Sequence, residues 1–524
     1  MGLSKARAVY FPLYFIVAFI VLTLGFFKFG TVEWLTPNTG KVIVFVLAAF
    51  LFFSAGYIFV IKKQKPMHEA YLSFDYLKAV RVLFVIGAVS AIAYYVTDII
   101  ITYGNHAFDY ARYPGAAYDF AEYLQRLYAQ GSGFEYPMWF RYITRFHTLC
   151  FGIVLSGLTW GLFYFKRFKA YEKALWGLLL LVYLIRSWMT AAQSYFFILL
   201  FICITFFLYK IYRILNSAEE RNKIARKIFI QSLALVVVAI ICMTFVYIFQ
   251  NDRSIQRDIR VQLRNNIIEK GYEFDAQIYE KTVLDSINIR LGKEVFEVRY
   301  GFEGTCANAS GEPDFSKNVS VRKGAEVLEI GSIDKYYVLD KENSILYKIN
   351  PRLYFAVQSV EMYATQGYGA LGLSFEHDFD WTYLIGNSRF VTNFIDEHFG
   401  TNIFERTYIY KNEQVFNWSS TTYWQSLYAW LASDFTYYGV ILVFGFIGML
   451  YAKVWLEVIR YRNPFAFAMM FMMVFGIMMA SANNLLFQDL GLCIATSSVI
   501  ILFALSLILR KRKAKKQLNA SNEK

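Results

Sequence analysis

Arginine side chains recur at helical spacing in the middle of the chain. Arg253, Arg257, Arg260 and Arg264 are separated by four, three and four residues, which places them on one face of a helix. A guanidinium is planar and presents a fork of N–H donors, so a row of them suits a diphosphate. The alternative is a solvated basic face beside lipid headgroups. The spacing makes Arg253, Arg257 and Arg260 candidate diphosphate ligands.

Two more arginines stand at the start of an apolar run, 139–165. Pro137 precedes the run, as proline often does at a helix start, and Arg141 and Arg145 follow one helical turn apart. The positive end of the helix dipole would lie beside them, which favours a bound anion. The alternative is that both side chains reach out to lipid phosphates. Arg141 and Arg145 are therefore a second candidate anion site.

Arg186 lies near the end of another apolar run, 175–188. An ionisable side chain inside a membrane span is costly, and for that reason Arg186 is a functional candidate, here a further candidate diphosphate ligand. The structural alternatives are that it snorkels to the membrane surface or forms an ion pair with Asp98 in the run 80–102. Both interpretations of Arg186 stay open at this point.

Acidic side chains and one imidazole gather late in the chain, where they could act as a general base. His377 and Asp378 adjoin each other, and Glu361 and Asp434 lie in aromatic stretches on either side. We retain all four as catalytic candidates, against the alternative of ordinary loop polarity. Aromatic residues nearby could stack on sugar rings, but we favour the aromatic belt of a membrane interface. These are Tyr354, Tyr363, Tyr368, Trp418, Trp424 and Trp430.

The composition indicates where these residues act. The chain has 524 residues, of which 57% are hydrophobic and 18% are charged, against about 25% charged in an ordinary soluble domain. One soluble core cannot bury so much apolar surface, so the composition predicts an all-α polytopic membrane protein. Five scattered cysteines and five scattered histidines form no metal-ligand pattern. We expect neither a metal nor another cofactor.

About ten segments are apolar and long enough for membrane-spanning helices. They cover residues 9–27, 42–61, 80–102, 139–165, 175–188, 195–208, 229–249, 438–458, 465–479 and 490–509. Lysine and arginine concentrate in every second connection and in the tail, whereas the short connections 30–40, 190–194 and 484–489 carry none. Basic connections stay in the cytoplasm, so both termini are predicted to be cytoplasmic.

These segments divide the chain into four parts. Residues 1–250 form a bundle of seven helices with an outer loop at 103–137, in which 116–130 is expected to be an amphipathic helix. Residues 251–435 form a large extracytoplasmic region, 436–509 hold three closing helices, and 510–524 are a basic cytoplasmic tail.

The large extracytoplasmic region is mixed in character. Its start, 252–288, has helical periodicity, and we expect the helix that carries the arginines to continue the seventh span, 229–249, out of the membrane. Its end, 351–430, predicts aromatic, amphipathic helices near the membrane. Between them, 294–349 looks like a small β-like insertion, in which 336–339 and 345–349 are expected to be strands around the polar turn 340–344.

The net charge of +13 follows the predicted topology. The region 251–435 holds 19 Lys and Arg against 26 Asp and Glu, a net charge of −7, so the remainder carries +20, mostly on cytoplasmic connections and the tail. Basic charge placed by the positive-inside rule implies no nucleic acid partner. The few arginines at the outer face are the exception to that rule.

Several short motifs accompany this layout of many spans, one large outer loop and a few closing spans. They are the return to the membrane from Tyr423 to Gly439, the helix start Asn463-Pro464-Phe465, the pair Asn483-Asn484 and the late-loop stretch from Tyr363 to Leu371. Layout and motifs together resemble the Wzy-type oligosaccharide repeat unit polymerases, the O-antigen and capsular polysaccharide polymerase family. Arg260 and Gly271 also fit that family's Arg-x10-Gly pattern.

The resemblance implies a GT-C-like glycosyltransferase in the bacterial cytoplasmic (inner) membrane. It would transfer a growing glycan from undecaprenyl diphosphate to a new lipid-linked repeat unit, making an O-antigen, capsule or exopolysaccharide. Arginines would stabilise the leaving diphosphate, and an acid or histidine would take the proton of the acceptor hydroxyl. The implied partners are the lipid-linked donor and acceptor, the bilayer, a chain-length regulator and a flippase.

Two alternatives to a polymerase stay open. A ligase of the same fold would move finished glycan to lipid A or protein, and the sequence barely separates the two. A polysaccharide flippase or transporter commonly shows repeated halves around a midplane site, and no repeat is visible here.

Overall fold

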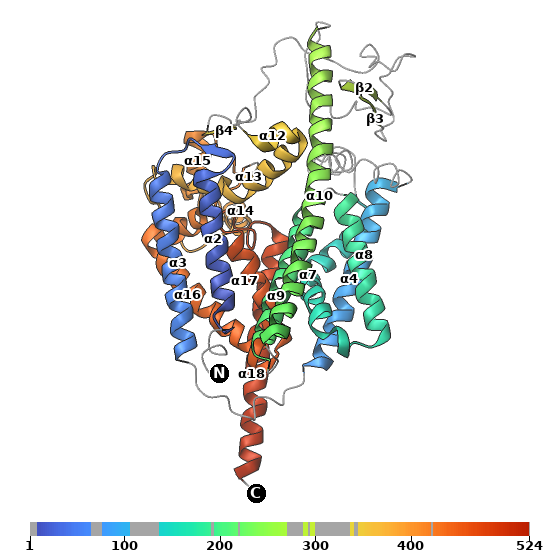
Figure 1. The fold of residues 1–524 in the computed structure, drawn as a ribbon, viewed down its shortest axis with the longest axis vertical. Coiled ribbons are helices and arrows are strands. Elements are labelled where there is room, and N and C mark those ends of the chain that lie inside the picture. The colour runs from blue at the N-terminus through green and yellow to red at the C-terminus, as the bar shows by residue number, and fades with distance from the viewer. Residues whose placement is uncertain are drawn as a thin grey trace.

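The chain forms a bundle of long helices with shorter helices packed over one end (Figure 1). The structure is a computed structural model that describes residues 8–63, 76–104, 136–189, 193–217, 221–269, 287–291, 294–298, 336–339, 344–420 and 423–522. In chain order the elements are α2 (Phe11–Phe29), β1 (Val32–Trp34), α3 (Thr39–Lys62), α4 (Leu77–Tyr103), α7 (Met138–Tyr164), η3 (Phe165–Arg167), α8 (Ala170–Met189), α9 (Gln193–Leu215), α10 (Arg221–Glu269), β2 (Ile287–Leu291), β3 (Glu294–Val298), β4 (Tyr337–Leu339), α12 (Ile345–Ile349), α13 (Pro351–Ser374), α14 (Arg389–Phe399), η5 (Phe404–Arg406), α15 (Tyr408–Phe416), α16 (Leu427–Tyr461), α17 (Pro464–Met478) and α18 (Leu490–Asn522).

Membrane-spanning character is clear for most of the long helices. Within the described ranges, eight helices are long and apolar enough to cross a bilayer, namely α2, α3, α4, α7, α9, α10, α16 and α18. Large apolar side chains stay exposed on their outward faces, such as Val44 at 68% and Ile240 at 58%. In water such surfaces would be unfavourable, but they match a hydrocarbon solvent. The fold is therefore that of an all-α, multi-pass integral membrane protein.

The two remaining predicted spans are helices as well. α8 packs against α4, and α17 packs against α7, α9, α16 and α18. Every residue of α17 is buried, which makes it the central helix of this part of the bundle. Its start is held by Asn463, whose Oδ1 accepts the N–H groups of Phe465 and Ala466 while Nδ2 donates to Ser506 Oγ at 2.8 Å.

The two ends of the bundle differ in charge and in the helices that pack over them. α2 begins and α18 ends at the same end (Figure 1). Here Tyr57 Oη donates to the carbonyl of Val9, and Tyr164 Oη donates to the carbonyl of Arg462. We term this the basic end, because the predicted cytoplasmic lysines and arginines lie there. The opposite end, which carries α13, α14 and α15, is termed the loop end.

α16 is two helices joined at Thr436. This residue has φ 61° and ψ 168°, a backbone conformation that only glycine adopts without strain. The kink separates a short first part, which belongs to the loop end, from the long part that runs through the bundle. Asp434 and Trp430 lie on the first part, so the kink decides where their side chains go.

The small β structure differs from the prediction in two places. β2 and β3 form an antiparallel pair with Ile289 opposite Phe296; β3 lies in the predicted β-like insertion 294–349, but β2 precedes that insertion and begins inside the predicted helical stretch 252–288. The expected pairing of 336–339 with 345–349 is wrong, because β4 pairs with β1, placing Val338 opposite Glu33, and Ile345–Ile349 is the helix α12. Ser344 Oγ accepts the N–H of Tyr347 and starts that helix. The predicted amphipathic helix at 116–130 lies outside the described residues.

Candidate functional site

A small polar pocket lies at the loop end, where the start of α14, the first part of α16 and the connection from α17 to α18 meet. Its volume is about 190 Å³. It is lined by Arg389, Ser420, Tyr423, Trp424, Gln425, Trp430, Asn483, Gln488 and Asp489. One cation, one carboxylate, several amides and aromatic rings are the side chains that bind an anionic or hydroxyl-rich ligand.

Arg389 is the cation of this pocket and the first residue of α14. Its Nη1 donates to the carbonyl of Ser420 at 2.9 Å, and the guanidinium lies 5.5 Å from the ring centre of Phe404. Burial lowers the pKa of Arg389 below its usual value, yet an arginine remains charged at neutral pH. A guanidinium has five donors, so this side chain keeps capacity for an anion. The N-terminus of α14 adds positive potential.

The pocket also holds donors and acceptors for a polar ligand. Gln488 Nε2 is buried and donates no hydrogen bond within the described part of the chain. Asp489 uses Oδ1 to accept the N–H of Leu492 at 2.8 Å, which leaves acceptor capacity on its carboxylate. Trp430 Nε1 donates to Asn483 Oδ1 at 3.2 Å, which fixes the indole against the α17–α18 connection.

Three of the short motifs found in the sequence meet around this pocket. The N–H of Trp424 donates to Gln366 Oε1, and the rings of Tyr363 and Trp424 lie 4.6 Å apart. A Cβ on Gly367 would lie 2.4 Å from the carbonyl oxygens of Ser481 and Ala482. The late-loop stretch, the return to the membrane and the Asn483-Asn484 connection are therefore packed into one unit.

Asp434, one of the catalytic candidates, anchors the loop that leads into Arg389. Its Oδ1 accepts Thr382 Oγ1 at 2.5 Å and the N–H of Gly386 at 2.9 Å, and Oδ2 accepts the N–H of Asn387 at 2.9 Å. Asn484 holds the same loop by donating to the carbonyl and Oδ1 of Asn387. Both carboxylate oxygens of Asp434 are thus engaged in holding this loop, whereas a catalytic role for Asp434 stays a prediction.

Glu361 lies on α13 and faces the turn between α2 and β1. Its Oε2 accepts the N–H and the hydroxyl of Thr31 at 3.0 and 2.7 Å, and Oε1 accepts the N–H of Val32 at 2.9 Å. The side chain is 6% exposed and does not line the polar pocket. These contacts give Glu361 a structural role, whereas a catalytic role stays a prediction.

His377 and Asp378 lie beyond α13, next to α15. His377 Nε2 is 3.1 Å from Asn412 Oδ1, and because Asn412 Nδ2 is the donor of the amide, His377 Nε2 carries the hydrogen. Burial lowers the pKa of His377 below its usual value, so the ring is neutral at pH 7. Asp378 is exposed, and its carbonyl accepts Lys411 Nζ. Neither residue lines the polar pocket.

Arg186 has the structural partner that the sequence offered as an alternative. Its guanidinium is 2.9 Å from Asp98 Oδ2 and lies over the rings of Tyr94 and Tyr95, at 5.3 and 5.2 Å from their centres. The ion pair with Asp98 is confirmed, and it joins α8 to α4. His147 of α7 stacks on Tyr94 with ring centres 4.5 Å apart, which adds a third helix to the cluster.

The other predicted arginines are distributed along two helices. Arg141 Nε donates to the carbonyl of Tyr136 at 3.1 Å, and Arg145 is exposed. The predicted continuation of the seventh span is confirmed, because α10 runs without a break from Arg221 to Glu269 and includes positions 253, 257 and 260. The side chains of Arg253, Arg257 and Arg260 lie outside the described part of the structure.

The aromatic belt interpretation is wrong for four of its six residues. Trp418, Trp430, Tyr354 and Tyr368 are at most 2% exposed and belong to the protein interior. The prediction fails because local sequence does not distinguish an aromatic core from an aromatic rim. Trp424 and Trp430 line the polar pocket.

Sequence reasoning missed Arg389, Gln488 and Asp489. For Gln488 and Asp489 the sequence signal was the neighbouring Asn483-Asn484 pair.

Within the described ranges, no group of three or more His, Cys, Asp or Glu side chains is placed to hold a metal ion. No family model, curated protein or solved structure matches the chain. The class defined by the fold is that of a multi-pass integral membrane protein with a polar pocket at its loop end.

Proposed function

We propose that this chain is a membrane glycosyltransferase that polymerises undecaprenyl-diphosphate-linked oligosaccharide repeat units into a surface polysaccharide. In this proposal α8 and α17 also cross the bilayer, which gives ten spans in a GT-C-like arrangement. The basic end faces the cytoplasm of a bacterium, and the loop end faces outward. The observation that carries the proposal is the polar pocket, because it combines a half-buried arginine, a carboxylate and aromatic rings.

Each part of the reaction has a candidate group in that pocket. A hydroxyl of the acceptor sugar attacks the anomeric carbon of the donor, the new glycosidic bond forms, and the bond to the lipid diphosphate breaks. Arg389 stabilises the negative charge that develops on the leaving diphosphate. Asp489 accepts the proton of the attacking hydroxyl. The rings of Tyr423 and Trp424 stack on the sugars, and Gln488 donates to a sugar oxygen.

The arginine positions on α10 extend this scheme to the second lipid-linked substrate. Positions 253, 257 and 260 follow the apolar part of the same helix, at the loop end of the bundle (Figure 1). In the proposal these guanidiniums hold a lipid diphosphate at the membrane surface. Polymerisation needs two lipid-linked substrates at once, so two cationic sites are expected.

The test is complementation of a deletion strain in the native host. We expect Arg389→Ala and Asp489→Asn to reduce the product to a single repeat unit while protein level stays normal. Arg257→Ala combined with Arg260→Ala is expected to do the same. The matched control is Arg406→Ala, because Arg406 contacts Tyr383 and does not line the pocket.

The accumulated glycan distinguishes the alternatives. A deletion that leaves single repeat units on the surface supports the polymerase. A deletion that accumulates long chains on the lipid carrier overturns it in favour of the ligase, and repeat units retained on the cytoplasmic side overturn it in favour of a flippase. If long-chain polysaccharide persists unchanged in Arg389→Ala, the assignment of the pocket is wrong.

A further inference from the structure

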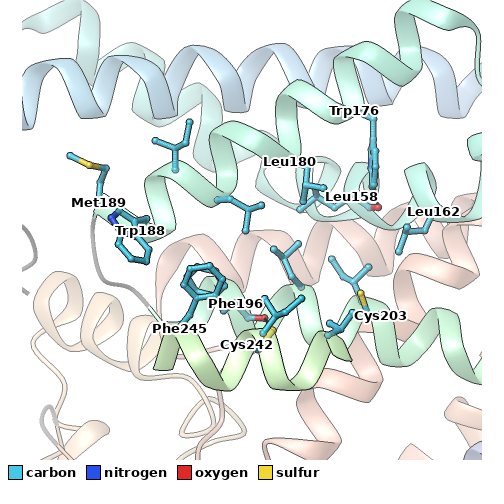
Figure 2. Close-up of a pocket in the computed structure, with 16 residues that line it drawn as sticks. Leu158, Leu162, Trp176, Leu180, Trp188, Met189, Phe196, Cys203, Cys242 and Phe245 are labelled. Carbon is cyan, nitrogen blue, oxygen red and sulfur yellow. Dashed lines mark hydrogen bonds between the residues drawn. The ribbon is translucent and has the colours of Figure 1, made fainter. Parts of the chain in front are cut away.

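A second cavity, entirely apolar, lies between α8 and α10, with α7 and α9 behind it. Its volume is about 710 Å³. Figure 2 shows the ring of Trp176 and Leu162 at one end and Trp188, Phe196 and Phe245 at the other. We refer to it as the apolar cleft. Trp188 and Phe245 lie 5.7 Å apart and Phe196 and Phe245 4.4 Å apart, so three rings form its boundary toward the loop end.

The lining of the cleft suits a hydrocarbon chain. Its lining consists of aliphatic and aromatic side chains, methionine and the thiols of Cys203 and Cys242. A water molecule needs two to four polar partners, which such walls do not supply. An empty space of this size would forfeit the dispersion contacts that hold membrane helices together. The volume also lies within the range of about 300–1,000 Å³ typical of ligand sites.

The cleft runs along the helices for much of the bilayer. On α8 its lining extends from Trp176 to Met189, and the thirteen steps between these two residues rise about 20 Å at 1.5 Å per residue. The hydrocarbon core is about 30 Å thick, so a lipid chain lying in the cleft stays at membrane depth. α8 and α10 present apolar exposed surface on both sides of it, including Leu181 at 54% and Val237 at 47%.

α10, which forms one wall of the cleft, continues to the arginine positions. α10 contributes Val238, Ile241, Cys242 and Phe245 to the lining and continues as one helix through position 253. Position 253 follows Phe245 by eight positions on α10, a rise of about 12 Å. A ligand that matches this order has a long apolar chain followed by a multiply charged anionic group. A phospholipid matches the chain but carries a less charged headgroup.

We propose that the apolar cleft binds the isoprenoid tail of a polyprenyl diphosphate, with the diphosphate held beyond Phe245 toward positions 253–260 of α10. The inference rests on the proposed function and adds to it the place where the lipid carrier is held. The cleft positions the carrier, and the polar pocket at the loop end performs the chemistry.

The experiment uses native mass spectrometry of the purified full-length protein with undecaprenyl diphosphate. Leu180→Trp and Val238→Trp place a large ring in the cleft and are expected to weaken binding by about tenfold or more. Leu181→Trp and Val237→Trp are the matched controls, since each is adjacent in sequence to the residue it is compared with and is exposed. The controls are expected to bind as the wild type does. Phosphatidylglycerol, offered separately, is expected to bind equally to all five proteins.

Several outcomes would overturn the inference. It fails if both filling variants bind undecaprenyl diphosphate as well as their controls do while all proteins have the same thermal stability. It fails equally if phosphatidylglycerol, and not undecaprenyl diphosphate, is lost on filling. Leu180→Trp lies on α8 and Val238→Trp lies on α10, so the second variant still tests the inference if the first does not fold. Carrier binding that depends on the cleft in a protein without polymerase activity would sustain this inference and reject the proposed function.

Discussion

Glu361 Oε1 on α13 accepts the backbone N–H of Val32 at 2.9 Å, across 329 residues of sequence. Together with the bonds to Thr31, this contact fastens the loop end to the turn between α2 and β1. The turn leaves no room for a larger residue at position 30, because a Cβ on Gly30 would lie 1.8 Å from Glu361 Oε1. The carboxylate therefore connects the beginning of the bundle to the helix that supports the polar pocket.

Replacing Glu361 is expected to lower stability more than activity. Glu361→Ala removes the acceptor of the buried N–H of Val32 and of the half-buried N–H of Thr31, and an unsatisfied buried group costs about 1–3 kcal/mol. Glu361→Gln keeps one acceptor oxygen and should lose less. Thermal unfolding of the purified protein measures both, with Glu405→Ala as the exposed control. Normal stability combined with loss of polysaccharide per folded molecule would instead make Glu361 catalytic.

Gly367 is expected to tolerate no side chain. Its Cβ would meet the carbonyl oxygens of Ser481 and Ala482 and the N–H of Ser426, which are backbone atoms of two packed elements. We expect Gly367→Ala to cost about 1–3 kcal/mol by overpacking. Gly177→Ala is the matched control, because nothing lies within 4 Å of that position, and it should be neutral or slightly stabilising. Equal melting temperatures for the two variants would contradict this packing.

The ion pair between Arg186 and Asp98 is expected to be structural. Asp98→Asn removes one carboxylate that pairs with the guanidinium and should destabilise the protein by roughly 1–3 kcal/mol, since polar pairs in membranes contribute less than fully buried ones in soluble cores. The double variant Asp98→Asn with Arg186→Gln should recover part of that loss. Glycan chain length reports on function in the same strains. A stable double variant that makes no polymer would show that the charge of Arg186 is needed for the reaction.

Stability is expected to fall at acidic pH because of His377. Its pKa is lowered by burial in the folded protein, so the unfolded chain binds the proton more tightly. The contribution to stability is complete above the ordinary histidine pKa of about 6.5 and is lost as the pH falls from there toward the folded pKa. Scanning fluorimetry between about pH 7.5 and pH 5.5 measures this. His377→Gln, which keeps an N–H donor for Asn412, should show a smaller fall; an identical fall would assign the effect to another group.

The helices were predictable because a membrane imposes a length and a polarity on each of them. Every predicted span is a helix, and the basic connections lie together at one end. The continuation of α10 beyond the apolar segment was also predictable, since the arginine spacing has the period of a helix.

The loop end was less predictable because its contacts join distant segments. β4 pairs with β1 more than 300 residues away, and a local alternation of apolar residues cannot reveal such a partner. Ile345–Ile349 looks like a strand by residue type, but Ser344 and the Asn350–Pro351 pair define helix starts on either side. Arg389 was overlooked because its importance comes from α14 lying beside the α17–α18 connection, which only the tertiary structure provides.

The shortness of α17 has a consequence for how a substrate arrives. Its fifteen residues span about 22 Å, whereas the hydrocarbon core of a bilayer is about 30 Å thick. If α17 crosses the bilayer as the proposed function requires, the connection that follows it, with Asn483, Gln488 and Asp489, lies below the level of the outer headgroups. In that proposal a sugar attached to a lipid reaches this depth from the side, with its anchor still in the bilayer. A free sugar would have to leave bulk water first, so the depth of the pocket would favour membrane-anchored substrates.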